Sequence, residues 1–209
     1  MKKIYLFLFF TSISAIAQSG KFKSEVILET KLSCRANFVD DERVWMGMDK
    51  ERYGFYDKKK DTTILKEIQS VNRTNEFRSI AGTKEAIFIL AVGNPAMLIR
   101  IDKKTLEETV VYKEEHEKVF YDSMQFVDDL NGFAMGDPIE NCLAFIKTSD
   151  GGKTWKKVNC DVLPKVSEGE AAFATSNTNL TIKGKSIFMV SGGKKSRVFV
   201  SKDFGATWK

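Results

Sequence analysis

Charged side chains recur at nearly equal spacing through this chain. Arg35, Arg78, Asp122 and Glu170 are separated by 43, 44 and 48 residues. Each lies at or near the start of a short apolar stretch that is typical of a β-strand. Two arginines and two carboxylates that converge would suit a polar or zwitterionic ligand, or a charged segment of a protein partner. The same four residues could instead neutralise one another as arginine–carboxylate ion pairs.

The elements that would position these residues repeat four times. Each unit has a strand, a polar turn, a second strand that reaches a glycine, and a third strand that leads into a turn with an aspartate. These aspartates are Asp57, Asp102, Asp150 and Asp203, with spacings of 45, 48 and 53. A period of roughly 40–50 residues with short strands is typical of the blades of a β-propeller. We therefore predict an all-β propeller with about four four-stranded blades, spanning approximately 31–70, 75–113, 118–161 and 168–209.

The first strand of each unit carries one of the four charged residues. We expect these strands over Cys34–Val39, Phe77–Ala81, Phe120–Val127 and Glu170–Thr175. Innermost propeller strands line the central channel, whose walls focus electrostatic potential and form a natural ligand site. In the last unit a polar turn is expected from Asn177 to Gly184 before the second strand.

The last unit stops one residue after Trp208, before a fourth strand can form. Propellers have typically 4–8 blades, so two interpretations remain open. Either a strand over Glu25–Thr30 closes a four-bladed ring, or the chain is a truncated part of a six- or seven-bladed ring. The unequal degeneration of the four repeats favours truncation.

Two of the turns share the eight-residue frame S/T-x-D-x-G-x-T-W. In such a frame the aspartate accepts backbone N–H bonds, glycine supplies a positive φ, and tryptophan anchors the next strand. The frame looks like the Asp-box, or BNR repeat, found at blade hairpins of β-propellers, and we expect its residues to be structural. They are Thr148, Asp150, Gly152, Thr154 and Trp155 in the third unit, and Ser201, Asp203, Gly205, Thr207 and Trp208 in the fourth.

Three further stretches resemble an exported bacterial family related to the photosystem II stability/assembly factors of plants and cyanobacteria. They are 120–126 with 131–138, 77–78 with 93–96, and 169–176, which is the most specific. Members of this family often carry the label oxidoreductase or glycosyl hydrolase. The resemblance covers nearly the whole mature chain. It implies a propeller of seven or a similar number of blades that acts as a binding or assembly scaffold.

A sialidase-like glycoside hydrolase is the alternative function. Its residue types are present as Arg35, Arg78, Arg197, Tyr121, Glu170 and Asp122. However, the Arg-Ile-Pro-type motif that opens such sialidases is absent, and adjacent strand residues point to opposite faces, so Tyr121 and Asp122 should not both line the channel. An oxidoreductase has no support, because neither G-x-G-x-x-G nor C-x-x-C occurs. We predict a non-enzymatic module with no catalytic residues and no cofactor.

The N-terminus is typical of export. Residues 1–17 form a predicted signal peptide, with two lysines, a short apolar run and cleavage before Gln18, which indicates a periplasmic or secreted protein. The run is too short for a membrane span. Its removal lowers the formal charge from +5 to +3. The lysines at 58–60 and 194–195 lack interleaved aromatics, so we expect solvated turns and no nucleic-acid partner.

Three cysteines occur, of which Cys142 and Cys160 flank the turn at 148–155. Pairing Thr148 with Trp155 places them one position out of register. A bulge could bring them together in a disulfide, but we expect two free buried thiols. His116 is the only histidine, so no metal site is expected.

Overall fold

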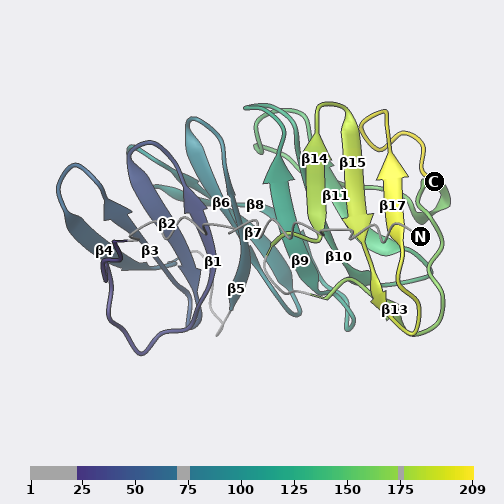
Figure 1. Cartoon of the computed structure of the whole chain (residues 1–209), viewed down its shortest axis with the longest axis horizontal. Helices are drawn as coiled ribbons and strands as arrows, with labels where there is room; N and C mark the ends of the chain where they lie inside the picture. Colours follow the sequence, from purple (N-terminus) through teal and green to yellow (C-terminus); the bar gives the residue numbers. More distant parts are fainter. Residues whose placement is uncertain (1–22, 70–75, 174–176) are drawn as a thin grey trace, which may run out of the picture.

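Four groups of strands stand side by side in chain order, from β1–β4 at one end to β14, β15 and β17 at the other (Figure 1). The computed structural model describes residues 23–69, 76–173 and 177–209. Within these ranges the regular structure is β-strand, apart from one 3-10 turn, η1 (Cys160–Val162). The predicted all-β architecture of four-stranded antiparallel sheets is therefore confirmed.

The first three sheets follow one plan, in which each strand pairs antiparallel with the next along the chain. The first sheet contains β1 (Cys34–Val39), β2 (Arg43–Met48), β3 (Arg52–Asp57) and β4 (Thr62–Glu67). The second contains β5 (Phe77–Gly82), β6 (Ala86–Ala91), β7 (Ala96–Asp102) and β8 (Glu108–Glu114). The third contains β9 (Tyr121–Phe126), β10 (Gly132–Pro138), β11 (Leu143–Thr148) and β12 (Lys156–Lys157).

The fourth unit departs from this plan, and the strand predicted over Glu170–Thr175 is wrong in extent. Only β13 (Glu170–Ala171) forms there, paired with β16 (Gly192–Gly193). The inner strand of the main sheet is β14 (Leu180–Lys183), which lies where a polar turn was expected. It pairs with β15 (Ser186–Val190), and β15 pairs with β17 (Val198–Ser201). Residues 174 and 175 of the predicted strand lie outside the described residues.

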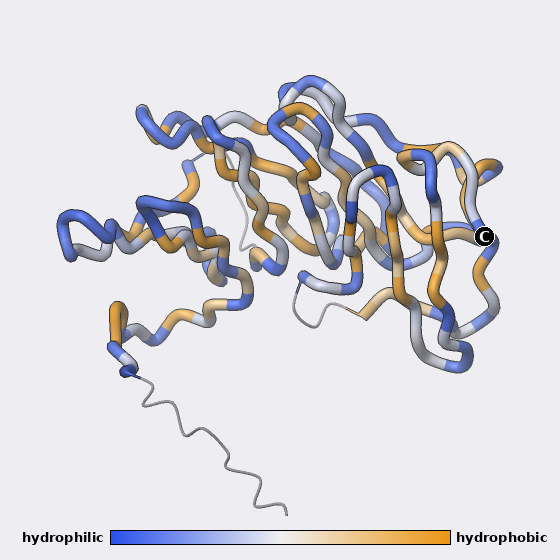
Figure 2. Tube along the Cα trace, turned by 45° about the horizontal axis from the view of Figure 1, so that its top comes forward, coloured by the Kyte–Doolittle hydropathy of each residue, from blue (hydrophilic) through white to orange (hydrophobic). Residues whose placement is uncertain are grey.

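Apolar side chains fill the spaces between successive sheets. The described residues form three buried clusters, one between each neighbouring pair of sheets, and Trp45, Phe88 and Phe145 are among their largest members. In Figure 2 hydrophobic residues follow the strands, while hydrophilic residues gather at many of the turns. The alternation of the strands thus directs one set of side chains against the neighbouring sheet. The inner strands β1, β5, β9 and β14 contact one another in that order.

Cys142 and Cys160 form a disulfide, so the prediction of two free thiols is wrong. The β11–β12 ladder alone would leave them out of register, as the sequence indicated. The chain departs from this ladder after Val158 and bends into η1, which begins at Cys160 and is capped by Asn159. This bend brings the two Cα atoms to 5.7 Å, within the usual span of a disulfide.

The segment Glu25–Thr30 forms no strand, and it lies against the first sheet rather than the fourth. The carbonyl of Ile27 accepts a hydrogen bond from the Thr63 hydroxyl on β4. The predicted signal peptide, 1–17, lies outside the described residues. Among the residues that are described, none belongs to a helix long and apolar enough to cross a membrane.

Candidate binding site

Each of the first three inner strands contains a one-residue irregularity at the same place in its pairing. The residues left out of the ladder are Arg35 in β1, Arg78 in β5 and Asp122 in β9. A bulge of this kind bends the strand and re-aims the side chain of its extra residue. Three of the four predicted binding residues therefore occupy equivalent positions on neighbouring strands, close to where each strand begins.

Arg35 and Arg78 share one carboxylate partner, Glu76. The Nε atom of Arg35 lies 2.9 Å from Oε1 of Glu76, and Nη2 of Arg78 lies 3.0 Å from Oε2. The Arg78 guanidinium also lies 5.5 Å from the centroid of the Phe120 ring. The side chain of Arg35 is 51% exposed, so exchanging Glu76 for an external anion would change the free energy little.

Asp122 is fully buried, and neither of its carboxylate oxygens has a hydrogen-bond partner in the part of the chain described. Burial raises the pKa of Asp122 to about 8, the neighbouring Asp137 charge adds to this effect, and Arg78 opposes it. The carboxyl group is therefore largely protonated at neutral pH. In that form it can donate one hydrogen bond as well as accept.

Glu170 has a separate set of partners. Its carboxylate accepts from Arg197 at 2.6 and 2.9 Å, from the Ser167 N–H at 2.8 Å, and from the Ser191 hydroxyl. The hydrogen bonds from Arg197 are the main reason why the pKa of Glu170 falls to about 2. Arg197 also stacks over Phe199, with 4.6 Å between the guanidinium carbon and the ring centroid. Glu170 is thus a fully neutralised anion.

The structure therefore links three of the four predicted residues and leaves the fourth apart. Arg35 and Arg78 meet through Glu76, while Arg78 lies close enough to Asp122 to lower its pKa. Sequence reasoning missed Glu76 and Asp137. Glu76 directly precedes β5, and the bulge at Arg78 interrupts the alternation of that strand, so no strand pattern signalled this pair.

Tyr121, the candidate nucleophile of the alternative function, points away from these residues. Its hydroxyl donates to Glu114 of β8 at 2.8 Å, and its ring packs edge-on against Tyr112. Burial is the main reason why its pKa lies well above the usual value, and the nearby Tyr112 and Glu114 raise it further. A tyrosine in this state is a poor nucleophile, and Tyr121 and Glu170 have different hydrogen-bond partners.

The two eight-residue turns at 148–155 and 201–208 have matching hydrogen bonds. In the first, Asp150 accepts from the Thr148 hydroxyl at 2.8 Å, from the Thr154 N–H at 3.0 Å and from the Thr154 hydroxyl at 2.6 Å. The corresponding distances to Asp203 are 2.8, 2.9 and 2.6 Å. Each turn thus satisfies its aspartate internally.

Trp155 and Trp208, at the ends of these turns, pack as large aromatic anchors. Trp155 is 6% exposed, and its ring meets Phe126 and Phe88 edge-on. Phe88 belongs to β6 of the second sheet, so Trp155 joins two sheets. Trp208 packs edge-on against Phe145, and its indole N–H donates to the Gly205 carbonyl.

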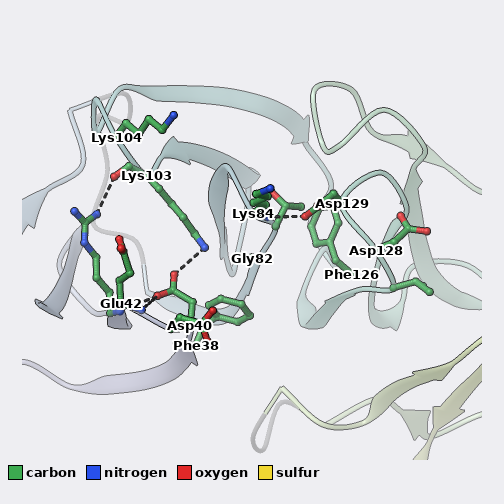
Figure 3. A pocket seen from close by; sticks show the side chains of 14 residues that line it. Phe38, Asp40, Glu42, Gly82, Lys84, Lys103, Lys104, Phe126, Asp128 and Asp129 are labelled. Carbon is green, nitrogen blue, oxygen red and sulfur yellow. Dashed lines mark hydrogen bonds and ion pairs between the residues drawn. The ribbon is translucent and has the colours of Figure 1, made fainter. Parts of the chain in front are cut away.

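A hollow of about 710 Å³ lies at the opposite end of the inner strands from the bulges (Figure 3). Its walls come from the turns after β1, β5, β7 and β9. Several of its charged groups are already paired, since Lys103 contacts Asp40 at 2.7 Å and Asp129 accepts from the Lys84 N–H at 2.6 Å. We therefore place the candidate site at the bulges. In the described chain, no group of three or more histidine, cysteine or acidic residues could hold a metal ion.

Comparison with solved structures shows a β-propeller. The WD40 repeats of RRP9 and the structure of U3-55K each match with a TM-score of 0.62 and 8% identity, over 88% of this chain. These matches cover 52% and 53% of those two proteins, so the chain spans about half of their length. Oligogalacturonate lyase in complex with manganese matches with a TM-score of 0.54 and 15% identity, over 83% of this chain and 51% of the lyase. At these identities the likeness shows the fold alone.

The other comparisons do not add a family. No protein-family model matches the sequence, and no curated protein matches it either. YCF48 bound to a D1 peptide matches with a TM-score of 0.49 and 13% identity, over 85% of this chain and 69% of YCF48, which is too low to carry an inference. The class defined by fold and sheet arrangement is therefore a propeller.

Proposed function

We propose that this chain is a non-enzymatic propeller that acts as a binding or assembly scaffold, similar to photosystem II stability/assembly factor-like proteins. Its ligand is a charged segment of a protein partner or a polar molecule, which binds at the bulged ends of β1, β5 and β9. The observation that carries this proposal is the placement of Arg35, Arg78 and Asp122 at equivalent bulges. Propeller neighbours such as the WD40 proteins support a binding role for the fold.

The arginine side chains at the first two bulges suit an anionic ligand, because the single carboxylate of Glu76 neutralises only part of their positive charge. Arg35 is half exposed, and within the described residues Glu76 is the only acidic residue that forms an ion pair with Arg35 or Arg78. A ligand carboxylate could replace Glu76 on Arg35 without exposing a buried charge. The buried Asp122 lies beneath the third bulge, where Arg78 is close enough to lower its pKa.

We further propose that the chain is exported, to the periplasm or beyond. The Cys142–Cys160 disulfide supports this location, because disulfides persist in oxidising compartments and are rare in the cytosol. Fusing residues 1–30 to an alkaline phosphatase reporter in a bacterial host tests the signal peptide. Activity only in the exported fraction is expected, and cytosolic retention would overturn this part of the proposal.

The binding proposal is tested by capture of partners from an exported-protein fraction. The bait is compared with Arg78→Ala, and with Arg52→Ala as a matched control on β3 of the first sheet, where Arg52 pairs with Glu67. We expect a captured protein that disappears with Arg78→Ala and remains with Arg52→Ala. Equal capture by the wild type, Arg78→Ala and Arg52→Ala would contradict the proposal that the partner binds at the bulges.

The glycosidase alternative is tested separately with a fluorogenic sialic acid substrate and the Glu170→Gln variant. No turnover by the wild-type chain is expected, because the Tyr121 hydroxyl is engaged by Glu114. Turnover that is lost in Glu170→Gln would establish an enzyme and overturn the scaffold proposal.

A further inference from the structure

Two buried polar groups of opposite charge lie at neighbouring bulges, and in the described chain neither has a hydrogen-bond partner. They are the Nε–H of Arg78 on β5 and both carboxylate oxygens of Asp122 on β9. The pairing irregularity falls at Arg78 in one strand and at Asp122 in the other, and β5 and β9 contact each other. A buried polar group without a partner is costly, so pairing these two groups would lower the free energy of both.

The surrounding contacts bring these two groups into one neighbourhood. The guanidinium carbon of Arg78 lies 5.5 Å from the centroid of the Phe120 ring, and Phe120 comes two residues before Asp122. The Phe120 carbonyl accepts from the Asp137 N–H at 2.8 Å, and the Asp137 carboxylate accepts from the Ala172 N–H at 2.8 Å. Burial raises the pKa of Asp122, the charge of Asp137 raises it further, and Arg78 lowers it. Among the described residues, Arg78 on β5 and Asp137 on β10 are therefore the charged groups that act on Asp122.

Glu76 holds Arg78 by only one edge of its guanidinium. Nη2 of Arg78 lies 3.0 Å from Oε2 of Glu76, and the other oxygen of Glu76 is shared with Arg35. The side chains of Arg78 and Glu76 are 25% and 27% exposed, and an ion pair that water reaches contributes little to stability. A guanidinium can bind a carboxylate through two parallel N–H bonds. The unpaired Nε–H of Arg78 is therefore available for a second carboxylate.

We propose that Asp122 competes with Glu76 and with an anionic ligand for the Arg78 guanidinium, and that ionisation of Asp122 weakens anion binding at the bulges. This inference rests on the proposed binding function and adds its regulation. A protonated Asp122 carries no charge and leaves Arg78 to Glu76 or to a ligand carboxylate. An ionised Asp122 draws Arg78 into an ion pair, and its charge also repels an anion at the same site. Both effects weaken anion binding as the pH rises through the titration of Asp122.

The fully buried Asp122 is a positioning residue in this proposal, because it acts through Arg78 and does not touch the ligand. Protons exchange with a buried carboxyl group without any ligand having to reach it. The coupling is also reciprocal, since two events that share one group must affect each other equally. An anion that engages Arg78 removes the charge that opposes protonation of Asp122, so bound ligand should raise the pKa of Asp122.

The competition itself is tested without a ligand, by NMR of the Asp122 carboxyl carbon in a ¹³C-labelled chain titrated across its pKa of about 8. Glu76→Gln should lower the pKa of Asp122, because Arg78 loses its other carboxylate. Arg78→Met should raise it, because the opposing charge is gone. In the Arg78→Met background, Glu76→Gln should have no further effect, because Glu76 acts only through Arg78. An unchanged titration in Glu76→Gln, or an equal decrease with and without Arg78, would overturn the competition.

The effect on binding is tested with the acidic peptide acetyl-Glu-Glu-N-methylamide and its neutral Gln-Gln form, followed by the ¹³Cζ signal of Arg78. We expect the wild type to bind the acidic peptide about fivefold or more weakly at about pH 9 than at about pH 6. Asp122→Asn keeps the shape and cannot ionise, so its affinity should be equal at both pH values. The same pH dependence in Asp122→Asn would overturn the proposal.

Two other outcomes separate this inference from the proposed function. If the wild type binds the acidic peptide equally at both pH values while partner capture depends on Arg78, only this inference fails and the scaffold proposal stands. If the acidic peptide binds no better than the neutral form at either pH value, and capture does not depend on Arg78, the anion site at the bulges is wrong and both proposals fail.

Discussion

The eight-residue turns follow β11 and β17 in the third and fourth sheets, whereas the bulges lie in β1, β5 and β9 of the first three sheets. In the third sheet, which has both features, they lie at opposite ends, and the two features differ in what they repeat. The turns at 148–155 and 201–208 repeat their side chains and their hydrogen bonds, with Asp150 and Asp203 satisfied by partners within each turn. The bulges repeat only the backbone irregularity, and they place an arginine, an arginine and an aspartate in it.

This difference separates a folding element from a recognition element. A turn that satisfies its own polar groups needs the same residues each time it is used. A bulge presents one side chain outside the ladder, and the identity of that side chain can vary without disturbing the strands. Changes in the turns should therefore alter stability and leave binding intact, whereas changes at the two arginine bulges should weaken binding with little loss of stability. The buried Asp122 is the bulge residue that should also affect stability.

The largest expected effect comes from Trp155→Ala. The indole packs between the second and third sheets against Phe88 and Phe126, so its removal should lower the free energy of unfolding by roughly 3–5 kcal/mol. Urea unfolding of the wild type and of Trp155→Ala measures this change in the free energy of unfolding. Trp208→Ala is the control, and because Trp208 is only partly buried its effect should be smaller. If Trp155→Ala changed the affinity for the partner and left stability unaltered, the turn would serve recognition, which would contradict its proposed role in folding.

The next effect is the pH dependence of stability that Asp122 produces. Its pKa is about 8 in the folded chain, above the ordinary value of 3.8, so the folded state holds the proton more tightly than the unfolded state. This contribution is complete at low pH and is lost as the pH rises toward 8. Between pH 5 and pH 7 the loss should be on the order of 3 kcal/mol.

Asp122→Asn removes the titrating group, so the slope of stability against pH should become flatter over this range. Melting temperatures of the wild type and the variant, measured from pH 5 to pH 8, check this expectation. Asp137→Asn is a useful second variant, because loss of its charge should lower the pKa of Asp122 and shift the slope to lower pH. Identical slopes in the wild type and in Asp122→Asn would show that the carboxyl does not stay protonated.

A smaller effect is expected at the first of the two turns. Asp150→Ala removes the acceptor for Thr148 and Thr154 and should cost roughly 1–2 kcal/mol, because the turn loses its internal hydrogen bonds. Although partial burial raises the pKa of Asp150, these hydrogen bonds hold it near 2, so the stabilisation should persist until the pH falls toward that value. Thermal unfolding at pH 7 and at pH 2 measures both effects. Reduced partner capture at an unchanged melting temperature would assign Asp150 to recognition instead.

The smallest effect on stability is expected from Arg35→Ala. The side chain is half exposed and makes one surface ion pair with Glu76, so the loss should be about 1 kcal/mol or less. Partner binding should nevertheless weaken, and surface plasmon resonance with the captured partner would measure this. The charge-matched Arg52→Ala variant should leave binding unchanged. A strong loss of stability in Arg35→Ala would mean that the bulge serves the fold.

The sequence alone determined the all-β architecture of four-stranded antiparallel sheets, because this depends on local patterns. Alternation within five or six residues specified the strands, and the recurrence of Asp57, Asp102, Asp150 and Asp203 predicted four sheets. The fourth unit failed because its inner strand is interrupted after Ala171 and resumes at Leu180, a break that no local propensity encodes. The polar residues in this interruption instead serve distant strands, as Asn177 does for Ile80 and Met124.

Only the tertiary structure decided which groups meet. Arg35 lies in β1 of the first sheet and Glu76 directly precedes β5 of the second, so no spacing rule within one strand could pair them. The raised pKa of Asp122 likewise depends on burial by neighbouring sheets, and the disulfide depends on the bend of the chain at η1. Short-range hydrogen bonds and strand alternation depend on residues that are close in sequence, so the sequence can predict them. Burial, ion pairs and the disulfide depend on residues that are far apart in sequence, and only packing brings these together.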